Sequence, residues 1–396
     1  MIKKISILAF SLVVLALSAV SCIYPFNPDT EDGSGALVIE GDILIGRNTE
    51  IMVSRTSPLT NPDAVFEAPA GKVWVEDDSG TTYNGEADPD SRGKYTVNTQ
   101  NADPSRDYRL HFLDQVSGKE YVSAWESVCS APVIDSLSYN LDYEKSFFNV
   151  ALSMHSLKES YFKWSYVEDW EYHSIYYSRI KAIWHKPISY RDDPYVTLEE
   201  RVFPDDDVYR CYKHGVSTQI LTFSTEHQTD DRFMDLEFLP IPRNDLRISY
   251  IYRIVVDLEP LTKDAYLYWE NIKTNSEYNG NLFAPTPSEL VGNIRCVQEP
   301  DELVMGYVNV AQIARDTLVV RRSEVNFYKD TERYQPVETV GPGQWVEFYQ
   351  NYYLPYDYAG MPPSFNETLW APARCVDCRE RGGTFDVPDN WPPPKN

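Results

Sequence analysis

The stretch Tyr250-Ile251-Tyr252-Arg253-Ile254-Val255-Val256-Asp257-Leu258 is the longest run in the chain with apolar side chains at every second position. Successive side chains of a β-strand point to opposite faces, so this run predicts a strand with one buried face. Similar, shorter runs occupy 148–154 and 162–166, and further strands are expected at 303–310 and 317–320. Residues 131–396 are therefore expected to form a large β-rich domain.

One segment near residues 262–275 has the pattern of a helix instead. Thr262 can cap its first turn, and Asp264 is favourable at the positive end of the helix dipole. Apolar side chains three and four residues apart would share one face: Ala265, Tyr268, Trp269 and Ile272. From Asn351 onward the chain is rich in Tyr, Pro and Gly, which predicts a loop-rich tail lying on the rest of the domain.

Residues 36–130 have the spacing of a small β-sandwich. The segments 73–75 and 81–83 flank the Gly-containing turn 77–80 and predict a hairpin. Short strands spaced roughly every 10 residues favour a sandwich over βαβ units. The predicted fold class is mainly β, with an N-terminal Ig-like or transthyretin-like β-sandwich followed by the larger β-rich domain with one or a few helices.

The first 35 residues predict export and a lipid anchor. Lys3 and Lys4 precede an apolar run over 5–20 that is short for a membrane-spanning helix, an order typical of a secretory signal over 1–21. Ala19-Val20-Ser21-Cys22 resembles a lipobox, in which Cys22 is acylated and becomes the mature N-terminus, although Ala19 replaces the usual Leu. The alternative is an ordinary signal peptide that leaves Cys22 unmodified. Residues 22–35 predict a tether.

The composition indicates a folded and strongly acidic protein. Of 396 residues, 42% are hydrophobic and 14% aromatic, which argues against disorder. Loss of Lys3 and Lys4 with the signal changes the net charge from −24 to −26, with 34 basic against 60 acidic residues. Such a charge repels phosphate backbones and argues against a nucleic-acid partner. The acidity indicates either solubility alone or attraction of cations and basic ligands.

The sequence shows none of the common catalytic, metal or cofactor motifs. A nucleophile elbow, a two-histidine zinc helix, a P-loop and a dinucleotide-binding glycine motif are all missing. No catalytic residue, metal ligand or cofactor is predicted. Two further interpretations stay open. Asp205-Asp206-Asp207 would be a weak calcium site or a solvated loop, and an unidentified pair of carboxylates would hydrolyse glycosides.

Five cysteines remain once Cys22 is set aside, and an exported compartment permits disulfides among them. We predict the pairs Cys211–Cys296 and Cys375–Cys378, with Cys129 left as a thiol. Redox and zinc chemistry are the alternatives for the Cys-x-x-Cys at 375–378. No helix is predicted at its first Cys to favour a thiolate, and no second Cys-x-x-Cys completes a zinc site.

A cluster of tyrosines near the C-terminus is the predicted contact surface for a ligand or partner. Its members are Tyr349, Tyr352, Tyr353, Tyr356 and Tyr358. Tyr is favoured at interfaces because its ring gives a large contact area with one polar group. The alternative is that these rings pack the tail onto the core.

Several stretches together resemble one known family. They are 37–41, 132–137, 209–212, 261–296 with Gly306-Tyr307, 375–379, 381–384 and Trp391-Pro392. This combination is similar to exported lipoproteins of Bacteroidota that are catalogued as domain of unknown function 4249. The resemblance extends over almost the whole mature chain.

The resemblance implies a lipid-anchored outer-membrane protein, often associated with a TonB-dependent receptor for nutrients, and it carries no catalytic residues. Acidic residues usually follow the acylated Cys of surface-displayed members. Here Ile23-Tyr24-Pro25-Phe26 intervenes, so both the surface and the periplasmic facing stay open. The leading hypothesis is a non-catalytic accessory module that binds a nutrient or the receptor. The alternatives are a structural or adhesive envelope protein and, less favoured, a surface glycan or peptide hydrolase.

Overall fold

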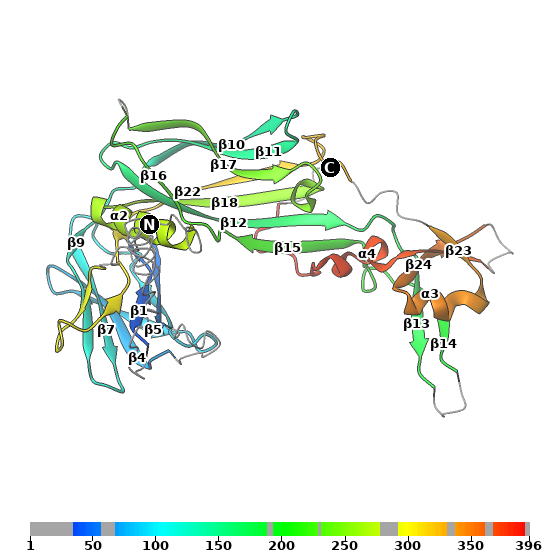
Figure 1. Cartoon of the computed structure of the whole chain (residues 1–396), viewed down its shortest axis with the longest axis horizontal. Coiled ribbons are helices and arrows are strands. Elements are labelled where there is room, and N and C mark those ends of the chain that lie inside the picture. The colour runs from blue at the N-terminus through cyan, green and yellow to red at the C-terminus, as the bar shows by residue number, and fades with distance from the viewer. Residues whose placement is uncertain are drawn as a thin grey trace, which may run out of the picture.

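The architecture follows from strands that pair across long distances in the sequence. The computed structural model describes residues 35–56, 68–187, 193–228, 231–277, 292–330, 337–360 and 367–392. The predicted signal, Cys22 and all but the last residue of the predicted tether lie outside these ranges. The described chain is mainly β with few helices, which confirms the predicted fold class at that level. Figure 1 shows an N-terminal unit, a central sandwich and a distal lobe following one another along the long axis.

The N-terminal unit contains a ten-stranded sheet whose inward side chains form one core. Nine of its strands follow the order β19 (Ile294–Cys296), β8 (Glu120–Ser123), β7 (Asp107–Asp114), β4 (Gly71–Asp77), β5 (Thr82–Ala87), β6 (Lys94–Asn98), β3 (Asn48–Arg55), β1 (Leu37–Glu40) and β20 (Val304–Met305), and β9 (Glu126–Ser127) pairs with β7. The predicted hairpin is β4–β5, with Val75 opposite Tyr83. The Ig-like or transthyretin-like topology stays a prediction.

Residues beyond 290 complete this N-terminal unit. β19 pairs with β8, β20 pairs in parallel with β1, and β21 (Val310–Ala311) pairs in parallel with β2 (Ile43–Leu44). The unit therefore takes strands from outside 36–130. The single strand predicted over 303–310 is broken at Gly306, whose φ is 130°. A Cβ at this position would lie 2.0 Å from the carbonyl oxygen of Ile39, so only Gly permits the approach.

The central sandwich packs a three-stranded sheet against a five-stranded sheet. The first sheet is β10 (Val133–Asp142), β11 (Phe147–His155) and β17 (Arg232–Pro242). The second is β15 (Arg210–Val216), β12 (Tyr161–His173), β18 (Ile251–Pro260) and β22 (Ala314–Arg321), and β16 (Leu221–Ser224) also pairs with β12. The alternating run predicted at 250–258 forms β18, between β12 and β22. Tyr252, Ile254, Val256 and Leu258 are fully buried in the core, whereas Tyr250 precedes the strand and is exposed.

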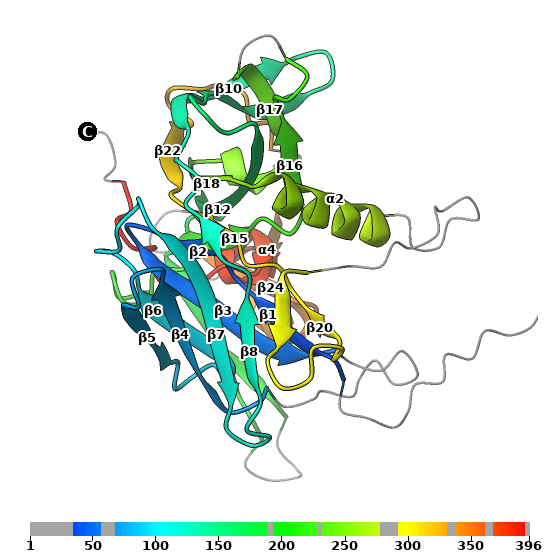
Figure 2. The same ribbon diagram turned by 90° about the vertical axis from the view of Figure 1, so that its left-hand side faces the viewer.

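The predicted helix is α2 (Lys263–Glu277), which lies beside the central sandwich in Figure 2. Thr262 caps it as expected, because its Oγ1 accepts a hydrogen bond of 3.2 Å from the backbone N–H of Ala265. Ala265 and Tyr268 are buried against Leu261 and Tyr307. Among the described residues, the structure contains no helix with the length and apolarity needed to span a membrane.

The distal lobe corrects the prediction of a loop-rich tail. Its elements are β13 (Ile180–His185), β14 (Tyr195–Glu200), β23 (Glu338–Val340), η2 (Pro342–Gln344), α3 (Trp345–Gln350), β24 (Tyr353–Tyr358), β25 (Thr368–Pro372) and α4 (Ala373–Val376). β25 pairs with β23 and β24, so two segments of the tail belong to a small sheet. The sequence did not reveal this sheet because its core is not an alternating apolar run: Trp370 is buried together with Val340 and Val196, which come from distant segments.

A buried ionic cluster joins the N-terminal unit to the central sandwich. Lys163 on β12 donates to Asp42 at 2.6 Å and lies 3.1 Å from Glu259 on β18. Asn309 donates its backbone N–H to Asp42 and its side-chain N–H to Glu259, at 3.0 and 2.9 Å. The Lys163 ammonium also lies 4.4 Å from the ring centroid of Trp269 on α2. Because a buried charge needs partners, these contacts fix how the two units meet.

The disulfide differs from both predicted pairs. It joins Cys211 on β15 to Cys378, at the start of η3 (Cys378–Arg381), across a sequence separation of 167. The prediction of Cys211–Cys296 was wrong because Cys296 lies on β19 in the core of the N-terminal unit. The prediction of Cys375–Cys378 was wrong because Cys375 is buried in α4, inside the distal lobe. Cys129 is a buried thiol.

Candidate functional site

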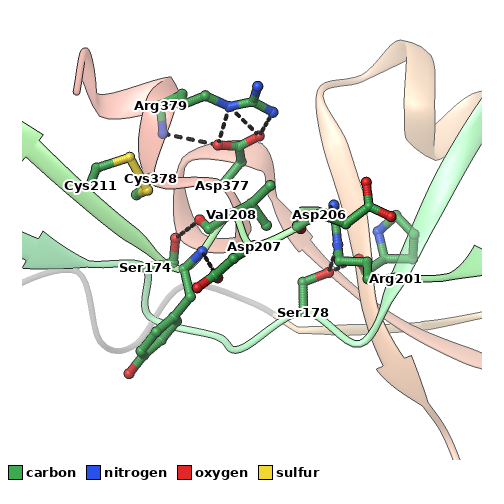
Figure 3. Close-up of polar contacts among 12 residues, drawn as sticks. Ser174, Ser178, Arg201, Asp206, Asp207, Val208, Cys211, Asp377, Cys378 and Arg379 are labelled. Atoms are coloured by element: carbon green, nitrogen blue, oxygen red, sulfur yellow. Dashed lines mark hydrogen bonds and ion pairs between the residues drawn. A yellow bond between two sulfur atoms is a disulfide. The ribbon is translucent and has the colours of Figure 1, made fainter. Parts of the chain in front are cut away.

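The central sandwich and the distal lobe meet at a short neck, formed by the residues after β12, the residues before β15 and the turn that starts η3. Ser174 donates its backbone N–H to Tyr209 at 2.8 Å and its hydroxyl to Val208 at 3.1 Å. Val208 also accepts the backbone N–H of Cys378 at 3.0 Å, beside the disulfide. Figure 3 shows how these segments, far apart in the sequence, are held together here.

A second group of polar contacts ties the neck to the distal lobe. Arg201 donates from Nε to the hydroxyl of Ser178 at 2.9 Å and from Nη1 to the carbonyl of Asp206 at 3.2 Å. The Asp206 carboxylate accepts from Lys181 on β13 at 2.7 Å and from the backbone of Val202 at 3.0 Å. The neck is therefore braced on both sides, and Asp206 is engaged by protein donors.

Five aromatic rings run along the surface of this neck. They are Tyr250, His173, Tyr209, Tyr177 and Phe203, which we call the aromatic strip. Consecutive ring centroids are 3.9, 4.7, 5.4 and 5.3 Å apart. Tyr250, Tyr177 and Phe203 are 37%, 48% and 41% exposed. Large rings that remain accessible in an otherwise well-packed protein indicate a contact or ligand surface.

The strand register explains why these rings lie together. His173 is the last residue of β12 and pairs with Arg210, so Tyr209 follows immediately beyond the pair. Glu171 pairs with Ile251 on the other side of β12, so Tyr250 extends past the same end of the sheet. The buried Glu171 carboxylate holds the His173 ring by accepting from Nε2 at 2.8 Å. The Glu171 contact leaves the Nδ1 edge of His173 for other partners.

A cavity of about 360 Å³ lies beside the first three rings of the strip, and we call it the neck cavity. It is lined by His173, Ser174, Ile175, Tyr209, Leu246, Ser249, Tyr250, Arg322, Tyr328, Asp330 and Arg381. Burial raises the pKa of the Tyr209 hydroxyl, so this group stays a neutral donor and acceptor. The size of the neck cavity, and its lining of aromatic rings with a few polar groups, are typical of a small-molecule binding site.

A larger open cavity of about 840 Å³ lies over one face of β12, β15 and β18, under the C-terminal segment 382–389. The charged side chains in this cavity centre on Asp169, which accepts a hydrogen bond from His214 at 2.9 Å and another from Arg253 at 2.7 Å. Arg253 in turn donates to the carbonyls of Asp389 and Asn390. Because these groups bind one another and the C-terminal segment, the arrangement holds that segment in place. The neck cavity is the better candidate site.

The predicted tyrosine cluster lies elsewhere, in the distal lobe. Tyr349 stacks on Trp184 at 5.4 Å, Tyr353 meets Phe348 edge to face, and Tyr356 stacks on Tyr176 at 4.6 Å. Tyr358 is half-buried, and only Tyr352 is largely exposed, at 81%. The cluster therefore mainly packs the lobe, and its role as a contact surface stays a prediction.

The sequence offered little signal for the aromatic strip. Its five rings come from four separate segments. Tyr250 begins the alternating run that forms β18, and Tyr209 begins the stretch 209–212 of the family resemblance, but neither pattern indicates a ligand site. His173 looked like one of six scattered histidines. Within the described ranges, no three His, Cys, Asp or Glu side chains are grouped in a way that could hold a metal ion.

The structure is that of a β-rich protein with an aromatic pocket at the neck between the central sandwich and the distal lobe. The model of the family described as Domain of unknown function (DUF4249) matches residues 23–317. The chain therefore belongs to this family. The match covers the N-terminal unit, most of the central sandwich, and the strip from His173 to Tyr250. The disulfide partner Cys378 lies beyond it.

Comparison with other proteins adds no assignment. No curated protein matches the chain. One similar solved structure is described as manganese lipoxygenase of Gaeumannomyces graminis with partial zonadhesin of Komagataella pastoris; it is 11% identical, covers 59% of this chain and 90% of its own, and has a TM-score of 0.16. The B domain of a biofilm associated protein is 7% identical, covers 74% and 89%, and has a TM-score of 0.14. Likenesses this remote carry no argument.

Proposed function

We propose that this chain is a non-catalytic binding module, anchored by an acylated Cys22 to the outer membrane, that serves a TonB-dependent nutrient receptor. The observation that supports ligand binding most directly is the aromatic strip beside the neck cavity. Three of its five rings are more than a third exposed, and all five follow one another in ring contact beside the cavity. Exposed apolar rings are unfavourable in water, and binding of a ligand or partner would bury them and remove that cost.

The arrangement of the units supports a role in which the anchored protein holds its binding site away from the membrane. The neck lies between the central sandwich and the distal lobe, on the side of the sandwich away from the N-terminal unit that follows the predicted tether (Figure 1). The disulfide and the polar contacts brace this neck, so its rings are pre-organised. A rigid site lowers the entropic cost of binding. The link to a TonB-dependent receptor comes from the family resemblance.

Affinity purification tests this proposal. The tagged full-length protein would be recovered from gently solubilised outer membranes and its companions identified by mass spectrometry. We expect a TonB-dependent receptor in near-equal amount. A Cys22→Ala variant should lose the membrane fraction while keeping the fold.

Two results would overturn the proposal. One is recovery of the protein without a receptor, together with no binding to a broad panel of glycans and peptides. The other is a deletion strain that grows on every nutrient but loses adhesion or envelope integrity, which would favour the structural or adhesive alternative.

A further inference from the structure

The neck cavity has an unusual charge for this protein. The chain carries 60 acidic and 36 basic residues, yet the cavity is lined by two arginines, Arg322 and Arg381, and by one carboxylate, Asp330. His173 adds a ring whose Nε2 is bonded to the buried Glu171 carboxylate at 2.8 Å. A concave site with an excess of cations attracts anions, even when the molecule as a whole is acidic.

The guanidinium of Arg322 is placed to bind an anionic group. Its backbone N–H is fixed by the carbonyl of Tyr250 at 2.8 Å, and its guanidinium lies 5.4 Å from the ring centroid of Tyr328. Within the described chain, its guanidinium makes one long hydrogen bond, 3.5 Å from Nη1 to the carbonyl of Ser249. The remaining N–H groups of this exposed side chain can form the two parallel hydrogen bonds that a carboxylate or sulfate accepts.

The rings around Arg322 indicate what carries that anionic group. Tyr209, Tyr250 and His173 offer flat apolar faces together with hydroxyl and imidazole edges. Such surfaces suit a ring that is apolar on its faces and covered with hydroxyls at its rim. The cavity is at the small end of the range for ligand sites, which favours a compact ring over an extended peptide.

We propose that the neck cavity binds an acidic sugar, a saccharide unit carrying a carboxylate or sulfate, with Arg322 on the anionic group and Tyr250 beneath the sugar ring. This inference rests on the proposed function and names its ligand class. Both kinds of ligand carry an anionic group on a pyranose ring, and that group is either a carboxylate or a sulfate.

Calorimetric titration of the soluble chain lacking residues 1–22 tests the proposal. The probes are trigalacturonate, a chondroitin sulfate disaccharide, neutral maltotriose and a tetraglutamate peptide. We expect at least one acidic saccharide to bind at least tenfold more tightly than maltotriose and the peptide. Arg322→Gln should weaken that binding at least tenfold, Arg322→Lys should restore part of it, and Tyr250→Ala should weaken it similarly.

The matched control is Arg295→Gln, an exposed arginine on β19 of the N-terminal unit, which should change binding less than twofold. Unchanged melting temperatures establish that each variant is folded. Equal binding of maltotriose, preference for the peptide, or full binding by Arg322→Gln would each overturn the ligand class. If no saccharide binds while a receptor still co-purifies with the full-length protein, this inference fails and the proposed function survives.

Discussion

The carboxyl group of Glu259 is buried between Lys163 and Asn309. Burial and the charge of Asp42 raise its pKa to about 7, although Lys163 lies 3.1 Å away. An unfolded Glu has a pKa of about 4.3, so the folded chain binds the Glu259 proton more tightly than the unfolded chain does. The contribution of Glu259 therefore makes the free energy of unfolding fall as the pH rises from about 4.5 to about 7. We expect Glu259→Gln to abolish a fall on the order of 1–3 kcal/mol between pH 5 and pH 7.5 in urea unfolding. Glu86→Gln, at an exposed position on β5, should keep the wild-type pH dependence. Parallel profiles for wild type and Glu259→Gln would contradict the raised pKa.

At the scale of elements, the disulfide fastens η3 to the edge strand β15. It closes a loop of 167 residues, and the chain-entropy model gives such a crosslink roughly 5 kcal/mol of stabilisation. Replacing Cys211 and Cys378 together by Ala should therefore lower the melting temperature by several degrees. Reductant should lower the melting temperature of the wild type but leave that of the double variant unchanged. Peptide mapping without reduction should recover the Cys211–Cys378 pair. A Cys375–Cys378 peptide, or equal melting temperatures for the wild type with and without reductant, would contradict this account.

At the scale of the whole molecule, the orientation of the distal lobe depends on the neck. Arg201 is half-buried and joins Ser178 to Asp206, whereas Arg179 makes a 3.4 Å ion pair with Asp357 at the surface, where such pairs contribute little. We expect Arg201→Ala to loosen the lobe, increase the maximum dimension in small-angle scattering and raise the rate of proteolysis at the neck several-fold. Arg179→Ala should leave both measurements unchanged. Identical scattering and proteolysis for the two variants would show that the neck does not depend on Arg201.

Local patterns were sufficient for many elements. The alternation at 250–258 predicted β18, the turn at 77–80 predicted the β4–β5 hairpin, and Thr262 with its apolar stripe predicted α2. Each of these depends on residues a few positions apart, where strand and helix periodicity is written directly in the sequence. The tail was harder to predict because its sheet is built around single buried rings such as Trp370.

The sequence by itself determined the mainly β class, the position of the long helix and the family. Only the tertiary structure decided three things: which cysteine pairs with Cys211, which strands complete the N-terminal unit, and that Tyr250, His173 and Arg322 share one cavity. The physical reason is that spacing in the sequence fixes which face a side chain takes on its own strand. Pairing between distant strands, which no local pattern specifies, fixes which faces and strand ends meet.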